Sequence, residues 1–516
     1  MGKSKAHLFG IIHLGASSMS ITIVEYTSID EVKVIEYASK NVAFGEELFH
    51  SKRLSFNTIE DLCRLLKGYK RLMEEYGVTE YKVYATAIVR EAENRLSILD
   101  QIFIQTGFKV EVVDMPKEIY YKYFGLYYHM MRQGLTDTED AALFLDITSG
   151  GVGITVWKGG ALLFQENVHL GTLRVMESFN RNQRSSLSFP DAVGEYLHSM
   201  LSPVQEEVSR FNVKYLVLSG DEAREVARLM GFEADGKETL SLLPKQFDEF
   251  VESFHGISAT KLVNRYQVPE YRANILMPTI VLYKELLKMV QPQCLLVSSS
   301  SFVDGVILYY GSETYPNNYL YMMREQNMQL ARAIARRFQV DEHHAREVER
   351  FSLQLCDALA EHGITDRMSF VMRIAAILAE VGKFVSLRNH SEHGYHIVMG
   401  TDLFGLSDRE KEVVANVVYY HYKGRPGNDD ENFRYLKEVQ KIWVTKLVAI
   451  LRLARALDVS HKNKISRISV KSKAKTLLIE AHTDKDISLE SWTFERETEY
   501  FSEIFGLQVK LKVGGK

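Results

Sequence analysis

The chain has 516 residues, which is too long for a single hydrophobic core and predicts about three or four domains. Hydrophobic residues make up 46% of the sequence and charged residues 25%, the balance of an ordinary globular protein rather than a disordered or fibrous one. The net charge of −4 argues against a dedicated DNA- or RNA-binding protein, whose phosphate contacts require a basic excess.

The spacing of the cysteines and the length of the apolar runs bear on the compartment in which the protein is expected. Cys63, Cys294 and Cys356 are odd in number, far apart and without CxxC spacing, so they predict neither a disulfide framework nor a zinc site. No stretch reaches the roughly 18 apolar residues of a membrane span, and the first ten residues lack the apolar core of a signal peptide. We therefore expect a cytoplasmic protein without membrane contacts.

The first elements predict a lobe with a partly parallel sheet. Residues 8–26 read as strand, small-residue turn and strand, because Ile, Val and Thr cluster on both sides of residues 15–18. A helix is expected over 56–78, a strand over 81–90, a further helix, and a strand over 108–114. Such alternation places helices on the faces of the sheet.

A second lobe of the same design follows. Residues 141–160 repeat the strand, glycine turn and strand, and helices are expected over 190–210 and 221–230 with strands over 214–220 and 294–300. Each lobe therefore opens with a glycine hairpin. A cleft between two such lobes would present both turns to one ligand.

From about residue 320 the strand pattern disappears and successive amphipathic helices follow, until strand-like alternation returns near the end. The expected fold class is α/β followed by α. Its predicted domains are a first lobe (1–135), a second lobe (136–315), a helical domain (316–465) and a small C-terminal α/β domain (466–516).

Four groups of residues have the chemistry of a phosphate site. The two glycine turns, at residues 15–18 and 150–153, expose backbone N–H groups that can surround phosphoryl oxygens. Arg90 is expected at the end of a strand as a phosphate clamp, and Glu118 in the first turn of a helix, where it can orient water. The alternatives are ordinary β turns, a solvated or capping arginine, and an acid stabilised by the helix dipole.

Six motifs occur in a fixed order: HLGASS (13–18), ATAIVREAEN (85–94), VDMPKEIYYKYFG (113–125), DITSGGVG (146–153), LGTLRVME (170–177) and LSGDEAR (218–224). This series resembles the exopolyphosphatase and guanosine pentaphosphate phosphohydrolase (Ppx/GppA) family. The resemblance implies two actin-like (ribonuclease H-like) ATPase-superfamily lobes, then an all-α HD-like domain and a small α/β domain. It extends over essentially the whole chain.

The resemblance also implies an activity, the release of terminal phosphate from inorganic polyphosphate or guanosine pentaphosphate. Glu118 would be the base for water attack, and Asp146 would hold Mg²⁺ or Mn²⁺. The ligand would be polyphosphate or guanosine penta- or tetraphosphate, and the protein a homodimer. The implied phosphate contacts come from Gly15, Ser17, Ser18, Arg90, Ser149, Gly150, Gly151 and Gly220.

The sequence departs from the family pattern at three acidic positions. His13 stands where an acid should start the first loop, Gly153 where a glutamate should end the second, and Lys117 replaces the glutamate before Glu118. With Asp146 and water as the remaining ligands, we expect weak metal binding. Two functions stay open: a phosphohydrolase, or a catalytically degenerate regulatory protein that binds polyphosphate or a nucleotide.

The helical part departs from its pattern too. An HD metal site uses a histidine, a His-Asp doublet and a distant aspartate. His344 and Asp458 are present, but the doublet reads Ala379-Glu380, so we expect no two-metal centre. Further histidines recur at three-residue steps, and polar packing between helices is the favoured interpretation of these: His390, His393 and His396.

Overall fold

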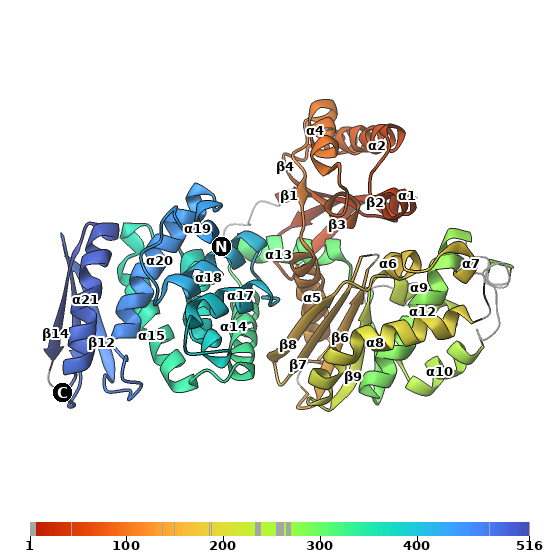
Figure 1. Cartoon of the computed structure of the whole chain (residues 1–516). Helices are drawn as coiled ribbons and strands as arrows, with labels where there is room; N and C mark the ends of the chain where they lie inside the picture. The colour runs from red at the N-terminus through yellow and green to blue at the C-terminus, as the bar shows by residue number, and fades with distance from the viewer. Residues whose placement is uncertain are drawn as a thin grey trace. The chain divides into compact units, whose positions relative to one another are not determined.

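A computed structural model describes residues 7–42, 44–136, 138–148, 150–184, 186, 188–232, 239–253, 263–264, 270–473 and 475–514. The chain forms two compact units, Met1–Met323 and Arg324–Lys516, drawn from red to green and from green to blue in Figure 1. Each unit is described by itself. The finer division into four domains stays a prediction.

The first unit begins with a five-stranded sheet in the order β3-β2-β1-β4-β5. Its strands are β1 (His7–Leu14), β2 (Ser18–Tyr26), β3 (Val32–Asn41), β4 (Glu80–Ala85) and β5 (Glu111–Val112). The β1–β2 hairpin is antiparallel, whereas β1–β4 and β4–β5 are parallel. The predicted first hairpin is present, and β3 extends it as a third antiparallel strand that was not predicted.

The helices of this lobe are α1 (Phe44–Ser51), α2 (Phe56–Glu75), α3 (Ala87–Arg90), α4 (Arg95–Thr106) and α5 (Met115–Arg132). Helix α2 begins where the Ser55 side chain accepts a hydrogen bond from the Thr58 N–H. Its buried residues recur every three or four positions, so one face packs into the core of the lobe.

A six-stranded sheet follows in the order β10-β11-β9-β6-β7-β8. Its strands are β6 (Ala141–Ile147), β7 (Val152–Lys158), β8 (Ala161–Val168), β9 (Val213–Ser219), β10 (Leu240–Leu242) and β11 (Cys294–Val297). In the antiparallel β6–β7 hairpin Asp146 lies opposite Gly153, and in the parallel β6–β9 pair it lies opposite Ser219. Asp146 is therefore at the end of a central strand.

The remaining helices of the first unit are α6 (Thr172–Glu177), α7 (Arg181–Arg184), α8 (Phe189–Ser209), α9 (Asp221–Leu229), α10 (Pro244–Glu252), α12 (Glu270–Val290) and α13 (Phe302–Thr314). Helix α13 lies against α5, with no room for side chains at the crossing. A Cβ at Gly305 would lie 1.8 Å from the Tyr121 carbonyl oxygen, and one at Gly125 would lie 2.9 Å from the Gly305 Cα. This contact fixes α5, which carries Glu118.

In the second unit, helices precede a small sheet. They are α14 (Tyr319–Arg337, which begins in the first unit), α15 (Glu342–Ala358), α16 (Asp366–Leu378), α17 (His390–Met399), α18 (Asp408–Tyr420), α19 (Glu431–Arg434) and α20 (Glu438–Ala456), with 3₁₀ turns η1 (Ala360–His362) and η2 (Val381–Phe384). Strands β12 (Arg467–Lys473), β13 (Thr476–His482) and β14 (Gln508–Gly514) form the sheet, with α21 (Ser488–Phe505) between the last two in sequence. Among the residues described, no helix is long and apolar enough to cross a membrane.

Candidate phosphate site in the first unit

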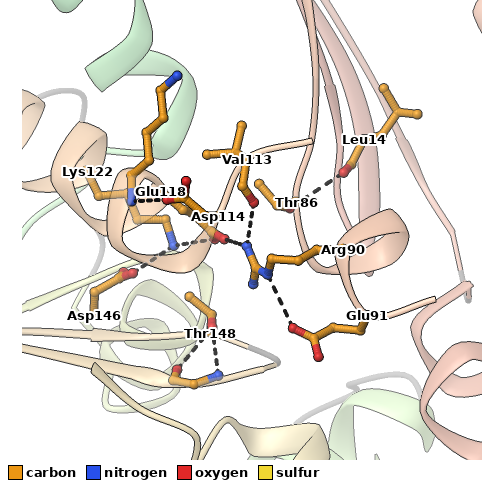
Figure 2. Close-up of polar contacts among 12 residues, drawn as sticks. Leu14, Thr86, Arg90, Glu91, Val113, Asp114, Glu118, Lys122, Asp146 and Thr148 are labelled. Carbon is orange, nitrogen blue, oxygen red and sulfur yellow. Dashed lines mark hydrogen bonds and ion pairs between the residues drawn. The ribbon is translucent and has the colours of Figure 1, made fainter. Parts of the chain in front are cut away.

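Arg90 is the centre of a buried polar cluster in the first unit. It lies in the short helix α3, which follows β4, and not at the end of a strand as predicted; the strand ends at Ala85. Its Nη1 donates to Glu118 Oε2 at 2.8 Å and to the Val113 carbonyl oxygen at 2.9 Å, and its Nε donates to Glu91 Oε1 at 3.2 Å. Figure 2 shows the guanidinium between the two carboxylates.

One nitrogen of this guanidinium has no such contact. Nη2 of Arg90 is buried and makes no hydrogen bond among the residues that the structure describes. A Cβ at Gly150, in the second glycine turn, would lie 3.8 Å from it. A buried donor without an acceptor is costly, so this nitrogen is ready to bind an anion at the turn.

Glu118 lies in the first turn of α5, after the N-cap Asp114, whose side chain accepts from the Lys117 N–H at 2.8 Å. Its carboxylate is buried between two cations, Arg90 and Lys122. Burial alone raises the pKa of Glu118, but Lys122 and Arg90 outweigh it and hold the pKa at about 2. The group therefore stays ionised and is a weak base.

Lys122 lies one helical turn after Glu118 and joins it to the second lobe. Its Nζ lies 2.8 Å from Asp146 Oδ2 and 3.4 Å from Glu118 Oε1. Burial by itself lowers the pKa of Lys122, but the two carboxylates raise it above its ordinary value. The ammonium is thus a fixed positive charge between the carboxylates.

A divalent ion at Asp146 does not fit this arrangement. The Asp146 side chain has no exposed surface; its Oδ2 accepts from Lys122 and its Oδ1 from the Ser219 hydroxyl at 3.2 Å. A hard cation such as Mg²⁺ requires several oxygen ligands, and both oxygens here are already engaged. Burial raises the pKa of Asp146, although Lys122 acts in the opposite direction. The raised pKa further disfavours the ionised carboxylate that a metal ion would need.

The second glycine turn explains why the expected glutamate is missing. A Cβ at Gly151 would lie 2.6 Å from Met115 Sδ, and one at Gly153 would lie 2.6 Å from Ile119 Cδ1, so α5 packs directly on this hairpin. A glutamate at 153 would collide with that helix. The turn itself is closed by Thr148, whose hydroxyl accepts from the Gly151 N–H at 3.0 Å.

The first glycine turn lies next to α3. The Leu14 carbonyl oxygen accepts from the Thr86 N–H at 3.1 Å, four residues before Arg90. The turn is closed by the Gly15 N–H, which donates to the Ser18 carbonyl oxygen at 2.9 Å, and Ser17 is exposed. His13 packs 4.8 Å from the Phe302 ring, and its Nε2 lies 3.2 Å from the Thr86 hydroxyl.

Of the predicted site residues, Arg90, Glu118 and Asp146 are joined in one cluster through Lys122, and Gly150 lies beside it. Gly220 follows β9 with a φ of +94°, and a Cβ there would lie 3.6 Å from Asp146 Oδ1. Among the residues that the structure describes, no hydrogen bond or ion pair joins Arg90 to the first-turn residues Gly15, Ser17 and Ser18. Ser149 lies outside the described residues.

Two contributors were not predicted. The signal for Lys122 was its spacing, since residues four apart share a helix face and a lysine one turn after a glutamate forms an ion pair. Arg174, from α6 of the second lobe, forms an ion pair with Glu91 Oε2; both lie in motifs of the series above, but their contact was not predicted. The cluster therefore draws on both lobes.

Comparison with known proteins agrees with this architecture. The sequence matches the description "Ppx/GppA phosphatase family" over residues 22–312 and "Ppx/GppA phosphatase, domain III" over residues 327–502. A curated relative, the bifunctional 3-dehydroquinate synthase/phosphatase of Fusobacterium nucleatum, is 22% identical over 317 residues. That match covers 58% of this chain and 46% of the relative, so the chain spans about half the length of the curated protein.

Two solved structures share the fold over about 60% of this chain. The Aquifex aeolicus member of the Ppx/GppA family has a TM-score of 0.52 at 21% identity, over 60% of this chain and 100% of its own. An exopolyphosphatase from Cytophaga hutchinsonii has a TM-score of 0.51 at 17% identity, over 60% and 99%. They support an actin-like ATPase-type fold with mixed sheets. Because the first family match alone spans more than half of the sequence, this chain belongs to the Ppx/GppA phosphatase family.

Proposed function

We propose that the chain binds the terminal phosphoryl group of a phosphoanhydride, inorganic polyphosphate or guanosine pentaphosphate, and hydrolyses it. The observation that carries this proposal is Nη2 of Arg90, a buried donor without a partner among the described residues, beside the turn at Gly150. Since the other nitrogens are held by Glu118, Glu91 and Val113, the guanidinium is already oriented. A preorganised arginine fork suits phosphate oxygens.

The chemistry of phosphoryl transfer suits such a site. The transferred group passes through a loose transition state, so catalysis consists mainly of positioning and neutralisation of charge. Arg90 and Lys122 supply two positive charges, and Glu118 between them orients the attacking water. A carboxylate with a pKa of about 2 is better suited to orienting the water by a hydrogen bond than to removing a proton from it.

In this proposal the Lys122 ammonium lies between Glu118 and Asp146 and supplies the positive charge that a divalent ion would otherwise supply. The resemblance implied Mg²⁺ or Mn²⁺, and the family match supports metal-assisted phosphatases in general. With both Asp146 oxygens engaged, no step is assigned to a metal in this unit. Phosphate release should therefore persist after treatment with a chelator.

A second candidate function is favoured by the same ion pairs. Glu118 is held by Arg90 and Lys122 at once, an arrangement that suits a stable binding site as well as turnover. In that case the chain is a regulatory protein that binds polyphosphate or guanosine penta- or tetraphosphate without cleaving it. A homodimer and a cytoplasmic location stay predictions; sedimentation of the purified chain tests the first.

The test measures phosphate release and binding on the same samples. The purified chain is incubated with long-chain polyphosphate or guanosine pentaphosphate, with and without chelator, and compared with Glu118→Gln and Arg90→Met. The control is Arg71→Gln, an exposed arginine on α2. Release that is lost in Glu118→Gln supports the hydrolase, and calorimetric binding without release supports the regulator. If Arg90→Met binds as the unchanged chain does, the proposed site is wrong.

A further inference from the structure

Three metal-ligating side chains converge in the second unit, outside the site above. They are His344 in α15, Glu380 between α16 and η2, and His461 in the turn after α20. One ligand atom from each lies within 4.8 Å of the others. Nε2 of His344 and of His461 lie 3.9 and 3.8 Å from the same oxygen, Glu380 Oε1.

Both histidines are oriented by carboxylates at their other nitrogen. His344 Nδ1 lies 2.8 Å from Asp458 Oδ2, and His461 Nδ1 lies 3.2 Å from Asp341 Oδ2. The two rings stack with their centroids 3.6 Å apart and their planes 11° apart. With Nδ1 donating to a carboxylate, each neutral imidazole presents the lone pair of Nε2. A histidine ligand in a metal site is typically fixed in this way.

The orienting carboxylates are themselves fixed by the backbone. Asp458 Oδ1 accepts from the Asn463 N–H at 2.9 Å, and Asp341 Oδ1 caps α15 by accepting from the N–H groups of His343 and His344. His461 holds a φ of +55°, a left-handed conformation that is unfavourable for a residue with a side chain. Together with Asn463, which is also left-handed, it shapes the turn that carries the His461 ring.

The three ligand atoms lie near one another without a hydrogen bond between them. The separations of 3.8 and 3.9 Å between each Nε2 and Glu380 Oε1 are too long for hydrogen bonds. Metal bonds of about 2.0–2.2 Å would place such atoms roughly 3.3 Å apart, so the ligand atoms have to move closer together and the stacked rings have to turn before both nitrogens face one ion. The one cation bound to Glu380 in the described part of the chain is Lys383, through its Nζ.

We infer that His344, Glu380 and His461 bind one divalent transition-metal ion. Two imidazole nitrogens and one carboxylate favour Zn²⁺, Co²⁺ or Mn²⁺ over Ca²⁺ or Mg²⁺. Three protein ligands leave coordination positions open for water or an anion. The missing His-Asp doublet does not prevent this, because a single ion needs only one ligand from the doublet positions, and Glu380 supplies it. The Lys383 ammonium competes with the ion for Glu380, and a third of the Lys383 side chain is exposed.

The test uses the full chain, freed of metal by a chelator and dialysed, and titrated with Zn²⁺ in a calorimeter. About one ion per chain is expected. Glu380→Gln and His461→Gln should weaken binding by more than about 100-fold, and Asp458→Asn by about 10- to 100-fold. The matched control is His343→Gln, since this histidine precedes His344 on the same helix and is exposed. It should bind as the unchanged chain does.

A second readout is independent of phosphate release. Co²⁺ bound by nitrogen and oxygen ligands absorbs visible light, and this band should disappear in His461→Gln, whose side chain is partly exposed and is not needed for the core. Circular dichroism of each variant checks the fold. Failure of the unchanged chain to bind Zn²⁺, or equal losses in the control and in the ligand variants, overturns the inference. Tighter binding in Lys383→Met supports the competition, and unchanged binding contradicts it.

Discussion

The two polar centres of this chain each hold a lysine at a carboxylate, and the lysines differ in burial. In the first unit Lys122 is 11% exposed and contacts both Glu118 and Asp146. In the second unit Lys383 is 34% exposed and contacts Glu380. A buried ammonium held by two carboxylates is a fixed positive charge, whereas one that is a third exposed can move into water. Under the two proposals above, Lys122 would replace a metal ion and Lys383 would compete with one.

Removal of the buried lysine should have the largest effect. Lys122→Met leaves Glu118 and Asp146 as buried carboxylates without their shared cation, and breaking a buried ion pair costs about 3–5 kcal/mol. The loss is measured as the change in the free energy of unfolding of the first unit in a urea titration. The double variant Lys122→Met/Asp146→Asn should recover part of it. An effect below about 1 kcal/mol would show that Lys122 is not a fixed counter-charge.

The pH dependence of stability should report Glu118. Its folded pKa of about 2 lies below the ordinary 4.5, so its contribution is fully present above pH 4.5 and is lost as the pH falls toward 2. The contribution is on the order of 3 kcal/mol. We expect the difference in unfolding free energy between the unchanged chain and Glu118→Gln to shrink across this window. A constant difference would place the stabilisation elsewhere.

The packing of the second hairpin on α5 is tested by Gly153→Ala. The new methyl group would lie 2.6 Å from Ile119 Cδ1, and overpacking typically costs about 1–3 kcal/mol. The melting temperature should fall accordingly. The control is Gly68→Ala on α2, where a new Cβ has open space around it. Gly159→Ala at the β7–β8 turn is unsuitable as a control because the φ of Gly159 is positive.

The exposed lysine should have the smallest effect. Lys383→Met removes a lysine whose side chain is one-third exposed, so water can replace part of its contact with Glu380, and metal-free stability should fall by less than in Lys122→Met. Thermal unfolding without Zn²⁺ measures the stability of the metal-free variant, and thermal unfolding with Zn²⁺ measures how much the ion stabilises it. A large loss of stability without metal would make Lys383 a structural residue like Lys122, and the two centres would then be alike.

The hairpins and their glycines could be predicted from sequence because β-branched runs and small-residue turns are local signals. Strand β3 (Val32–Asn41) was missed because its polar residues are mostly exposed and weaken the alternation. Arg90 was placed on a strand, since nothing local reveals that the strand ends at Ala85 and a single helical turn follows.

The centres themselves depend on tertiary contacts that no local pattern shows. Lys122 reaches Asp146 only because α5 packs on the second sheet, where Gly151 and Gly153 leave room for it. His461 was missed for a similar reason: its position depends on a left-handed turn and on Asp341, 120 residues earlier. The resemblance to an HD metal site indicated His344 and Asp458, and a hydrogen bond joins them in the structure.

Glu91 has a consequence for which anions can enter. Its two oxygens are held by Arg90 and by Arg174, so one internal carboxylate already sits between two guanidinium groups from different lobes. An anion at the proposed site, beside Nη2 of Arg90, would therefore lie close to a fixed negative charge as well as to the arginines.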